Sequence, residues 1–318
     1  MEFQRTYDLL GAGLHLATDS FRISEEARMF LGAYEVPSPR AARHSLVFEE
    51  SATMPAFAVP HLRRCRGPDV QIIEHKQRMF FSVAEGRACY NPQDRTCHGY
   101  VFPRSSAEYP EGTVPLIHLL VLQIMFEEGF LPWHGSAVDC RGQALVLSGE
   151  KGAGKSTLAL KLHLLGFPLI CDDLLYLRTG DNGLLAGGHC QAAKIKTEEA
   201  GFLQSRYEVA EGRITVPGKT LFCCRQINPE ALNRLYPVRA VVFLKNAASR
   251  GEAIVWADRE MEVFQRLLGD FPLLNTPDYR ARALDLFCGA SHCRFCLAQT
   301  SSNPDESAAA ILSALNDD

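Results

Sequence analysis

The sequence predicts an α/β protein with an N-terminal mainly β domain, and three observations support this prediction. An apolar, strand-like run at residues 144–148 is followed by a glycine-rich turn and then by a helix-like segment at 156–165. Short segments with period-two alternation occur in the first 110 residues. The 318 residues are 47% hydrophobic and 22% charged, as in ordinary globular proteins, and the chain is long enough for about two domains.

Charge and cysteine usage exclude several classes of protein. The chain has 33 basic and 37 acidic residues, a net charge of −4, so we expect neither nucleic acid nor a membrane surface as a partner. The apolar run at 114–126 is interrupted by His118 and Gln123 and is shorter than the ~18–20 residues of a membrane span. The first eight residues lack the pattern of a secretory signal, and the odd number of cysteines, 11, fits reduced thiols. We therefore expect a cytoplasmic protein.

The chain divides into two predicted domains. Residues 1–110 should form a β-rich accessory domain and residues 111–318 a second domain, because Pro, Ser, Gly and charged residues gather at 103–113. Segments 70–75 and 79–84 of the first domain alternate like strands. This domain contains no motif to which we can assign chemistry.

The second domain begins with an apolar segment that predicts a buried helix over 114–128. A strand within 131–139 should form a hairpin with the strand at 144–148, and the helix at 156–165 should lead to a strand at 167–171. This order of strand, loop, helix and strand predicts a parallel βαβ pair. The remaining predicted elements are a strand at 238–244 and helices at 259–268, 276–289 and 308–315.

The turn after residue 148 is a complete G-x-x-x-x-G-K-S phosphate loop. Its glycines permit positive φ and close backbone approach, so successive N–H groups can surround phosphate oxygens at the positive end of the next helix. Lys155 would place a charge on the β and γ phosphates, and the Ser156 hydroxyl would ligate Mg²⁺. The loop therefore predicts nucleotide binding by Gly149, Glu150, Lys151, Gly152, Ala153, Gly154, Lys155 and Ser156.

Two carboxylates follow the next predicted strand. Asp172 and Asp173 come directly after Cys171 and should lie at the same carboxyl edge of the sheet as the phosphate loop. One could hold Mg²⁺ while the other accepts the proton of an attacking hydroxyl, or both could simply cap the next turn. His134 could reach the same edge and orient the base, although a lone histidine is usually structural.

These residues resemble a known family. The segment 134–177, HGSAVDCRGQALVLSGEKGAGKSTLALKLHLLGFPLICDDLLYL, resembles the catalytic core of the HPr kinase/phosphorylase family. It is most similar to HPr kinase-like relatives of peptide biosynthesis clusters, including lasso-peptide serine kinases. The His-Gly pair, the phosphate loop and the Asp-Asp pair one strand later carry the resemblance. It implies an α/β phosphate-loop kinase core of the HPr kinase type and assembly as a homo-oligomer.

The resemblance also implies roles for individual residues. It implies that Asp172 is the catalytic base, that Asp173 and His134 assist it, and that Lys155 takes part in transfer. ATP and Mg²⁺ are the implied cofactors, with Ser156 and Asp173 as metal ligands. The residues implied to bind Mg-ATP are Gly149, Gly152, Gly154, Lys155, Ser156 and Thr157.

The sequence departs from the family at one place. No L-E-I-R-G-like segment, which supplies a magnesium-binding Glu and a substrate-side Arg in bifunctional members, is present; the nearest region offers Lys194, Lys196, Glu198 and Glu199. The departure argues against phosphorylase activity and against HPr itself as the substrate. Lys196 and Arg225 are candidates for contacting the product phosphate, although solvated surface charge is the more common role of such residues.

A second motif, Cys288, His292, Cys293 and Cys296, could supply zinc ligands. Strand-like alternation from 292 to 297 would place Cys293 and Cys296 on opposite faces, which favours packing over metal binding. The same default applies to His189 and Cys190.

We expect an ATP-dependent kinase that transfers the γ-phosphoryl group to a Ser or Thr hydroxyl of a small protein or ribosomal peptide. Two alternatives remain open. One is a small-molecule kinase or phosphoenolpyruvate carboxykinase-like enzyme on the same core, and the other is a non-catalytic, nucleotide-gated peptide-binding module.

Overall fold

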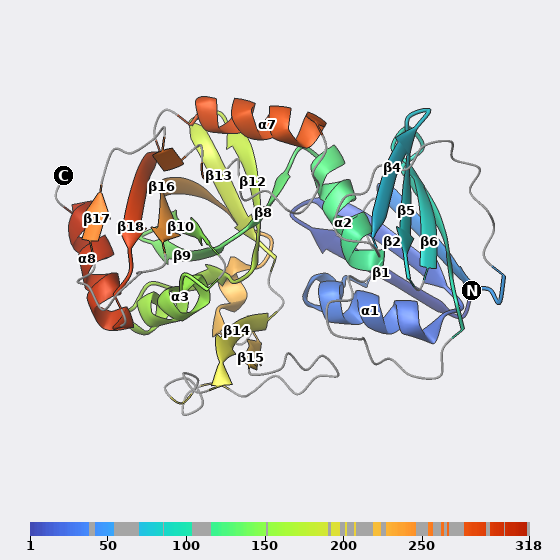
Figure 1. Ribbon diagram of the computed structural model, residues 1–318. Helices are drawn as coiled ribbons and strands as arrows, with labels where there is room; N and C mark the ends of the chain where they lie inside the picture. The colour runs from blue at the N-terminus through green and yellow to red at the C-terminus, as the bar shows by residue number, and fades with distance from the viewer. Residues whose placement is uncertain are drawn as a thin grey trace. The chain divides into compact units, whose positions relative to one another are not determined.

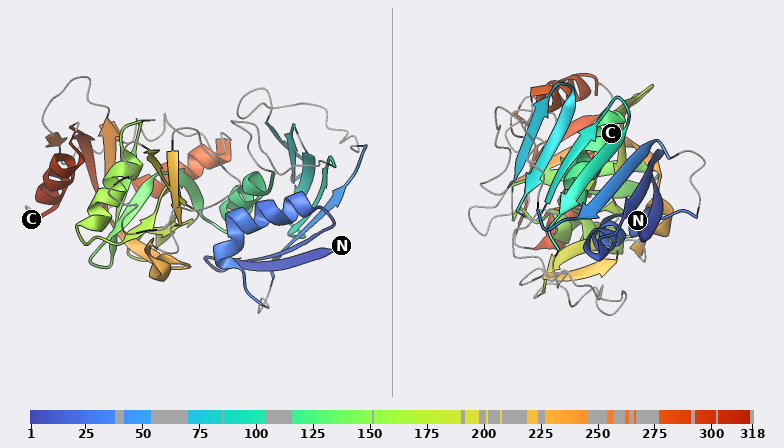
Figure 2. Two further views of the ribbon diagram at one scale, coloured as in Figure 1. Left: turned by 90° about the horizontal axis from the view of Figure 1, so that it is seen from below. Right: turned by 90° about the vertical axis from the view of Figure 1, so that its right-hand side faces the viewer.

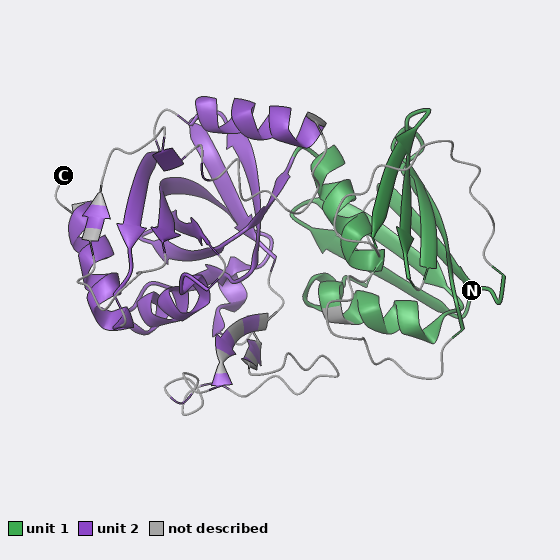
Figure 3. Ribbon diagram, in the orientation of Figure 1, with its two compact units in different colours: residues 1–129, 212–215 green, residues 130–211, 216–318 purple. Residues whose placement is uncertain are grey.

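The computed structural model is a mixed α/β structure that divides into two compact units (Figures 1 and 3). Unit 1 comprises residues 1–129 and 212–215, and unit 2 comprises residues 130–211 and 216–318. The structure describes residues 1–37, 42–53, 70–84, 86–103, 116–150, 152–189, 192–197, 201, 207, 219–223, 227–245, 254–256, 262–263, 266, 277–290, 293–301 and 303–316.

Unit 1 contains a seven-stranded sheet in the order β1-β2-β3-β7-β6-β5-β4. The β2–β3 and β3–β7 pairs are parallel and the other neighbours are antiparallel. The predicted β-rich N-terminal region is therefore present as a sheet. Its elements are β1 (Phe3–Leu9), β2 (Ala12–Thr18), α1 (Phe21–Leu31), a 3-10 turn (Gly32–Tyr34), β3 (His44–Glu50), β4 (Gln71–His75), β5 (Arg78–Val83), β6 (Gly86–Asn91), β7 (Thr96–Val101) and α2 (Leu116–Glu127).

Helix α2 belongs to unit 1, whereas the sequence-based division starts the second domain at residue 111. Ten of its twelve residues are buried, so the helix needs protein on nearly every side. Helix α2 packs against α1, β5 and β6, which all belong to unit 1. Unit 1 thus extends through α2 to Gly129. Residues 104–113, within the predicted boundary, lie outside the described residues.

Unit 2 is built on a nine-stranded sheet with the main order β11-β9-β10-β16-β13-β12-β8. Strand β18 extends it by pairing with β16 and β17, and β14 and β15 form a separate two-stranded sheet. Its strands are β8 (Leu131–His134), β9 (Ser136–Cys140), β10 (Gln143–Gly149), β11 (Leu169–Cys171), β12 (Leu174–Gly180), β13 (Gly183–Gly188), β14 (Ala192–Lys196), β15 (Lys219–Cys223), β16 (Leu235–Lys245), β17 (Ile254–Trp256) and β18 (Arg294–Gln299). Its helical segments are α3 (Lys155–Leu164), η3 (Pro229–Ala231), α7 (Pro277–Cys288) and α8 (Pro304–Asn316).

The prediction that β10 and β11 form a parallel pair is wrong, because the two strands are not neighbours in the sheet. Strand β9 lies between them and is antiparallel to both, with Val138 opposite Leu145 on one side and opposite Leu169 on the other. The tight β9–β10 hairpin, which turns at Gly142 with φ of 87°, occupies that edge of β10. The parallel neighbour of β10 is instead β16, which comes about a hundred residues later in the chain.

Most of the other predicted elements of unit 2 are present. The helices at 276–289 and 308–315 correspond to α7 and α8, and the strand at 238–244 is the central part of β16. Helix α8 packs beside α3, where Lys161 Nζ donates to Asp305 Oδ2 at 3.1 Å (Figure 2). Most of the helix predicted at 259–268 lies outside the described residues. None of the helices in the described part of the chain is both long and apolar enough to cross a membrane.

Replacing Gly99 in β7 with alanine should destabilise unit 1. A Cβ at this position would fall well inside contact distance of the Phe48 ring, which is fully buried and has no room to move away. We expect Gly99→Ala to lower the free energy of unfolding by about 1–3 kcal/mol, measured by denaturant titration.

The matched control is Gly32→Ala. Gly32 has a helical φ of −57°, and the atom nearest to an added Cβ is Arg28 Cγ at 3.7 Å. This change should leave stability unchanged or raise it by about 0.4–1 kcal/mol. Equal effects of the two substitutions would contradict the packing argument at Gly99.

Candidate functional site

The phosphate-loop sequence connects β10 to α3, and its backbone requires glycine at three positions. Gly149, Gly152 and Gly154 have φ of 140°, 85° and 88°, a region that residues with a Cβ rarely adopt. Gly154 is the N-cap of α3. At Gly149 the backbone of β16 leaves no space for a side chain, since a Cβ would lie 2.8 Å from the Leu244 nitrogen. The loop therefore presents its backbone at the N-terminus of a helix, the arrangement suited to anions.

Lys155 is folded over its own loop. Its Nζ donates to the carbonyl oxygen of Gly149 at 2.8 Å and to that of Glu150 at 3.1 Å, and the residue is only 8% exposed. An ammonium group has three donors, so carbonyl oxygens of the loop engage at least two of them. The charge of Lys155 is thus held at the centre of the loop.

Asp172 is buried at the end of β11 and is bound by a neighbouring hydroxyl. The Ser136 Oγ donates to Asp172 Oδ1 at 2.6 Å, and both residues are almost fully buried. Strands β9 and β11 are paired, with Ala137 opposite Cys171, and this pairing brings the two side chains together. Sequence reasoning gave Ser136 no role, although it lies two residues after the His134 that was singled out.

His134 and Asp173 form a second, exposed pair. His134 Nδ1 lies 3.2 Å from Asp173 Oδ1 and 3.0 Å from the Asp173 carbonyl oxygen, and each side chain is 42% exposed. Because both neighbours of Nδ1 are acceptors, this nitrogen carries the proton. Asp173 lies between β11 and β12 and has a positive φ of 75°, which is uncommon for a residue other than glycine.

The route by which His134 reaches this edge differs from the predicted one. The strand predicted within 131–139 is broken at Gly135 into β8 and β9, and His134 ends β8, which pairs with β12 rather than with β10. A Cβ at Gly135 would lie 2.8 Å from the Leu147 carbonyl oxygen, so the break brings two backbones close together. The structure thus joins His134 to Asp173 and Ser136 to Asp172.

Three charged side chains adjoin the loop on the side of β16. Lys245 Nζ and Arg266 Nη2 each donate to Glu262 Oε1 at 3.1 Å, and Arg266 Nη1 lies 3.7 Å from Glu150 Oε1. The hydrogen bonds from Lys245 and then Arg266 lower the pKa of Glu262. Sequence reasoning missed this network because Glu262 and Arg266 follow the loop by more than a hundred residues.

The other candidates from the sequence have the following placements. Ser156 and Thr157 lie in the first turn of α3, after Lys155, and are half-buried. His189 is buried, and its Nδ1 accepts a hydrogen bond from Tyr176 Oη at 2.9 Å, consistent with packing. Burial raises the pKa of Tyr176, so this phenol stays a neutral donor. The candidates outside the described residues, or without a described side chain, are Lys151, Cys190, Lys194, Lys196, Glu198, Glu199, Arg225 and His292.

The cysteine motif contributes no metal site in the described part of the chain. Cys288 is exposed at the end of α7, whereas Cys293, directly before β18, and Cys296, within β18, are buried. No group of three or more His, Cys, Asp or Glu side chains among the described residues is arranged to hold a metal ion.

Comparisons with known proteins give local matches. The chain is 41% identical over 54 residues to the HPr kinase/phosphorylase of a Geobacillus species, 42% over 57 residues to that of Chloroherpeton thalassium, and 43% over 58 residues to that of Prosthecochloris aestuarii. Each match covers 17–18% of this chain and 17% of the relative. No protein-family model matches the chain. This protein is therefore distantly related to the HPr kinase/phosphorylase family.

A comparison with solved structures gives a weaker likeness. The HPr(Ser) kinase/phosphatase from Coxiella burnetii aligns with a TM-score of 0.32 and 14% sequence identity, over 57% of this chain and 95% of that chain.

Removing the Ser136 hydroxyl should destabilise unit 2. Ser136→Ala deletes a donor to the buried Asp172 carboxyl group, and hydrogen bonds to charged groups contribute more than those to neutral groups. We expect a loss of about 1–3 kcal/mol in the free energy of unfolding, measured by denaturant titration.

Ser148→Ala provides the comparison within the same sheet. The buried Ser148 Oγ accepts from the neutral Trp133 Nε1 at 3.2 Å, and we expect its removal to cost about 0.5–1.5 kcal/mol. A larger loss for Ser148→Ala than for Ser136→Ala would show that the charge of Asp172 adds nothing to the bond with Ser136.

Proposed function

We propose that this protein is an ATP-dependent, HPr kinase-like kinase that transfers the γ-phosphoryl group to a Ser or Thr hydroxyl of a small protein or ribosomal peptide. The observation that carries the proposal is the phosphate loop, whose glycines have the positive φ values it needs and whose Lys155 lies at its centre. The distant relationship to HPr kinase/phosphorylase supports phosphoryl transfer as the reaction. The remaining expectations, cytoplasmic location and homo-oligomer formation, belong to the same proposal.

Phosphate binding would use the loop and Lys155. The backbone N–H groups ahead of α3 would surround the phosphate oxygens, with Gly154 allowing close approach. The ammonium group of Lys155 would exchange its bonds to the Gly149 and Glu150 carbonyls for bonds to the β and γ phosphates. This exchange keeps the buried ammonium group hydrogen-bonded in both states.

Asp172 is the proposed base. The acceptor oxygen would form a bond to the γ phosphorus as the bond from that phosphorus to the β–γ bridging oxygen breaks, so that ADP leaves and the hydroxyl proton passes to Asp172. Ser136 would orient the Asp172 carboxyl group through its hydrogen bond to Oδ1, and this carboxylate would take the proton. The proton is thus accepted by a group whose position is fixed by β9 and β11.

The edge of the sheet beside the phosphate loop offers oxygen atoms of the kind that Mg²⁺ binds. Mg²⁺ prefers hydroxyl and carboxylate oxygens, which Ser156 at the start of α3 and the half-exposed Asp173 could offer. When bound, Mg²⁺ would neutralise charge that develops on the phosphates. His134 would hold the Asp173 carboxylate through Nδ1.

Asp172→Asn should separate nucleotide binding from transfer. The purified protein is incubated with γ-labelled ATP, Mg²⁺ and the small proteins of its host lysate, and ATP affinity is measured in parallel. We expect Asp172→Asn to keep ATP affinity and to lose transfer by about 10²–10⁴-fold, because an amide does not accept the hydroxyl proton. Asp181→Asn, in the exposed turn between β12 and β13, is the control and should match the wild type.

Two outcomes of that experiment would contradict the proposal. Equal loss of binding and transfer in Asp172→Asn would exclude Asp172 as the base. No labelled protein or peptide with the wild type, with ATP binding intact, would favour a small-molecule acceptor or a nucleotide-gated binding module.

Lys155→Ala should weaken nucleotide binding. The substitution removes the charge from the centre of the loop, so ATP affinity should fall by at least roughly tenfold, measured by isothermal titration. Lys161→Ala is the control on the same helix, because its ammonium group pairs with Asp305 of α8. If the two variants bound ATP equally well, the loop would not be the nucleotide site.

A further inference from the structure

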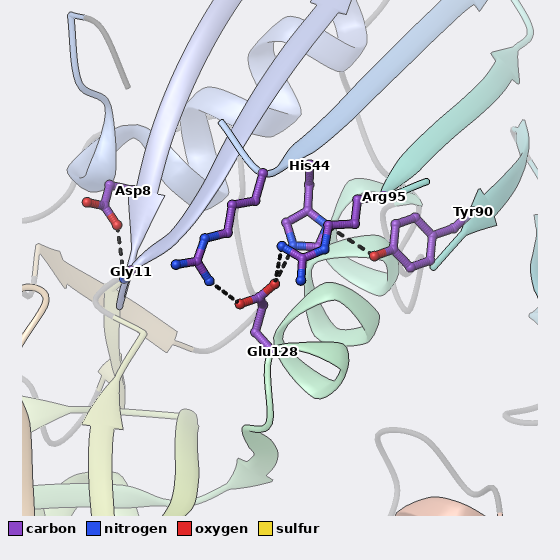
Figure 4. Close-up of polar contacts among 7 residues, drawn as sticks. Asp8, Gly11, His44, Tyr90, Arg95 and Glu128 are labelled. Atoms are coloured by element: carbon purple, nitrogen blue, oxygen red, sulfur yellow. Dashed lines mark hydrogen bonds and ion pairs between the residues drawn. The ribbon is translucent and has the colours of Figure 1, made fainter. Parts of the chain in front are cut away.

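One carboxylate of unit 1 contacts three basic side chains, two at the start of β3 and one in the turn between β6 and β7 (Figure 4). Glu128, directly after α2, accepts from Arg43 Nη1 at 3.1 Å through Oε2 and from His44 Nε2 at 2.9 Å through Oε1. Arg95 Nη1 lies 3.4 Å from Glu128 Oε1. The two guanidinium groups are therefore held on opposite oxygens of a single carboxylate.

The two arginines are anchored through their backbones. Arg43 N donates to the Gly13 carbonyl oxygen at 2.9 Å, and the Arg95 carbonyl oxygen accepts from Ser45 N at 2.9 Å. Arg95 has a positive φ of 55° in the turn between β6 and β7. Both side chains thus start from ordered positions at one end of the sheet, which lowers the entropy lost when they bind a ligand together.

His44 holds Glu128 through a hydrogen bond and adds no charge to the cluster. Tyr90 Oη donates to His44 Nδ1 at 3.0 Å, so the proton of the neutral imidazole is on Nε2, which faces Glu128. Burial lowers the pKa of His44 despite the opposing effect of Glu128. Partial burial acts to raise the pKa of Glu128, but the hydrogen bond from His44 and the charges of Arg95 and Arg43 outweigh this and lower it. At neutral pH two positive charges therefore face one negative charge.

The donors of the two guanidinium groups greatly outnumber their acceptors. Each guanidinium has five N–H donors, yet Arg43 makes one side-chain hydrogen bond and Arg95 makes one ion pair within the described part of the chain. The Arg43 and Arg95 side chains are 53% and 46% exposed, whereas that of Glu128 is 13% exposed. The unused donors are thus open to an external oxyanion.

We propose that Arg43 and Arg95 form a binding site for a phosphate monoester or inorganic phosphate, with Glu128 as the resident counter-ion that competes with the ligand. A dianion would match the two guanidinium charges if Glu128 moved away, and paired arginine forks suit phosphate oxygens. This site lies in unit 1 and does not depend on the phosphate loop or on the proposed kinase activity.

A purely structural explanation makes different predictions. Cations near the C-terminus of a helix are stabilising, so Arg43 and Arg95 could serve only to hold the end of α2. In that case, removing either arginine would change stability without changing phosphate binding. Neutralising Glu128 would likewise leave phosphate binding as it was.

The test uses the full chain carrying Lys155→Ala, so that the phosphate loop does not dominate binding. Inorganic phosphate and phosphoserine are titrated separately by calorimetry at constant ionic strength, and acetate serves as a carboxylate probe. We expect Arg43→Gln and Arg95→Gln each to weaken phosphate binding on the order of tenfold. Glu128→Gln should tighten it, because glutamine keeps an acceptor for His44 Nε2 but removes the competing charge.

Arg28→Gln is the matched control. Arg28 has the same side-chain exposure as Arg43, 53%, and pairs with Glu25 at 3.1 Å, but no second arginine is paired with that carboxylate in the described residues. It should bind phosphate like the Lys155→Ala parent. Tighter binding of phosphoserine than of inorganic phosphate would identify a phosphorylated side chain as the ligand, and equal binding would identify free phosphate.

Three results would overturn the proposal. They are unchanged phosphate binding in folded Arg43→Gln and Arg95→Gln, no gain in Glu128→Gln, or a loss in Arg28→Gln equal to that in the site variants. Thermal unfolding of each variant shows that it is folded before the titration. Because Glu128→Gln is expected to increase affinity, misfolding cannot imitate the supporting result.

Discussion

Leu244 of β16 passes so close to Gly149 that no side chain fits at that position, and the arrangement of the candidate site depends on this approach. The Glu150 N–H then donates to the Leu244 carbonyl oxygen at 3.3 Å, which leads the chain out of β10 and into the loop. The next glycines turn the backbone toward α3, and Lys155 folds back onto the Gly149 carbonyl. A central parallel strand pair thus determines where an anion can meet backbone N–H groups.

Two adjacent aspartates at this edge have opposite environments. Asp172 is buried and held by Ser136, whereas Asp173 is exposed and held by His134. The two side chains have different partners although they are neighbours in sequence, and Asp173 has a positive φ of 75°. Such a difference in burial and partners lets two carboxylates perform different tasks, which is how the proposed mechanism uses them.

Much of this arrangement follows from local sequence. The glycine spacing, the helix after it and the aspartate pair identify a phosphate loop and the edge at which it lies, because positive φ and helix capping are requirements of single residues. The strand order does not follow in this way. Pairing β10 with β16 joins segments about a hundred residues apart, and the choice of β9 over β11 as the other neighbour of β10 depends on the hairpin at Gly142.

The sequence by itself therefore predicted the phosphate loop, the helices α3, α7 and α8, and the strands β10, β11 and the central part of β16. Only the tertiary structure decided which side chain holds which, because Ser136 with Asp172, Arg266 with Glu150, and Arg43 with Glu128 are all contacts between distant segments. It also assigned α2 to unit 1, since a helix buried on nearly every side belongs with whatever elements cover it. Requirements such as a positive φ or a helix cap depend on a few consecutive residues, whereas these pairings depend on how the whole chain packs.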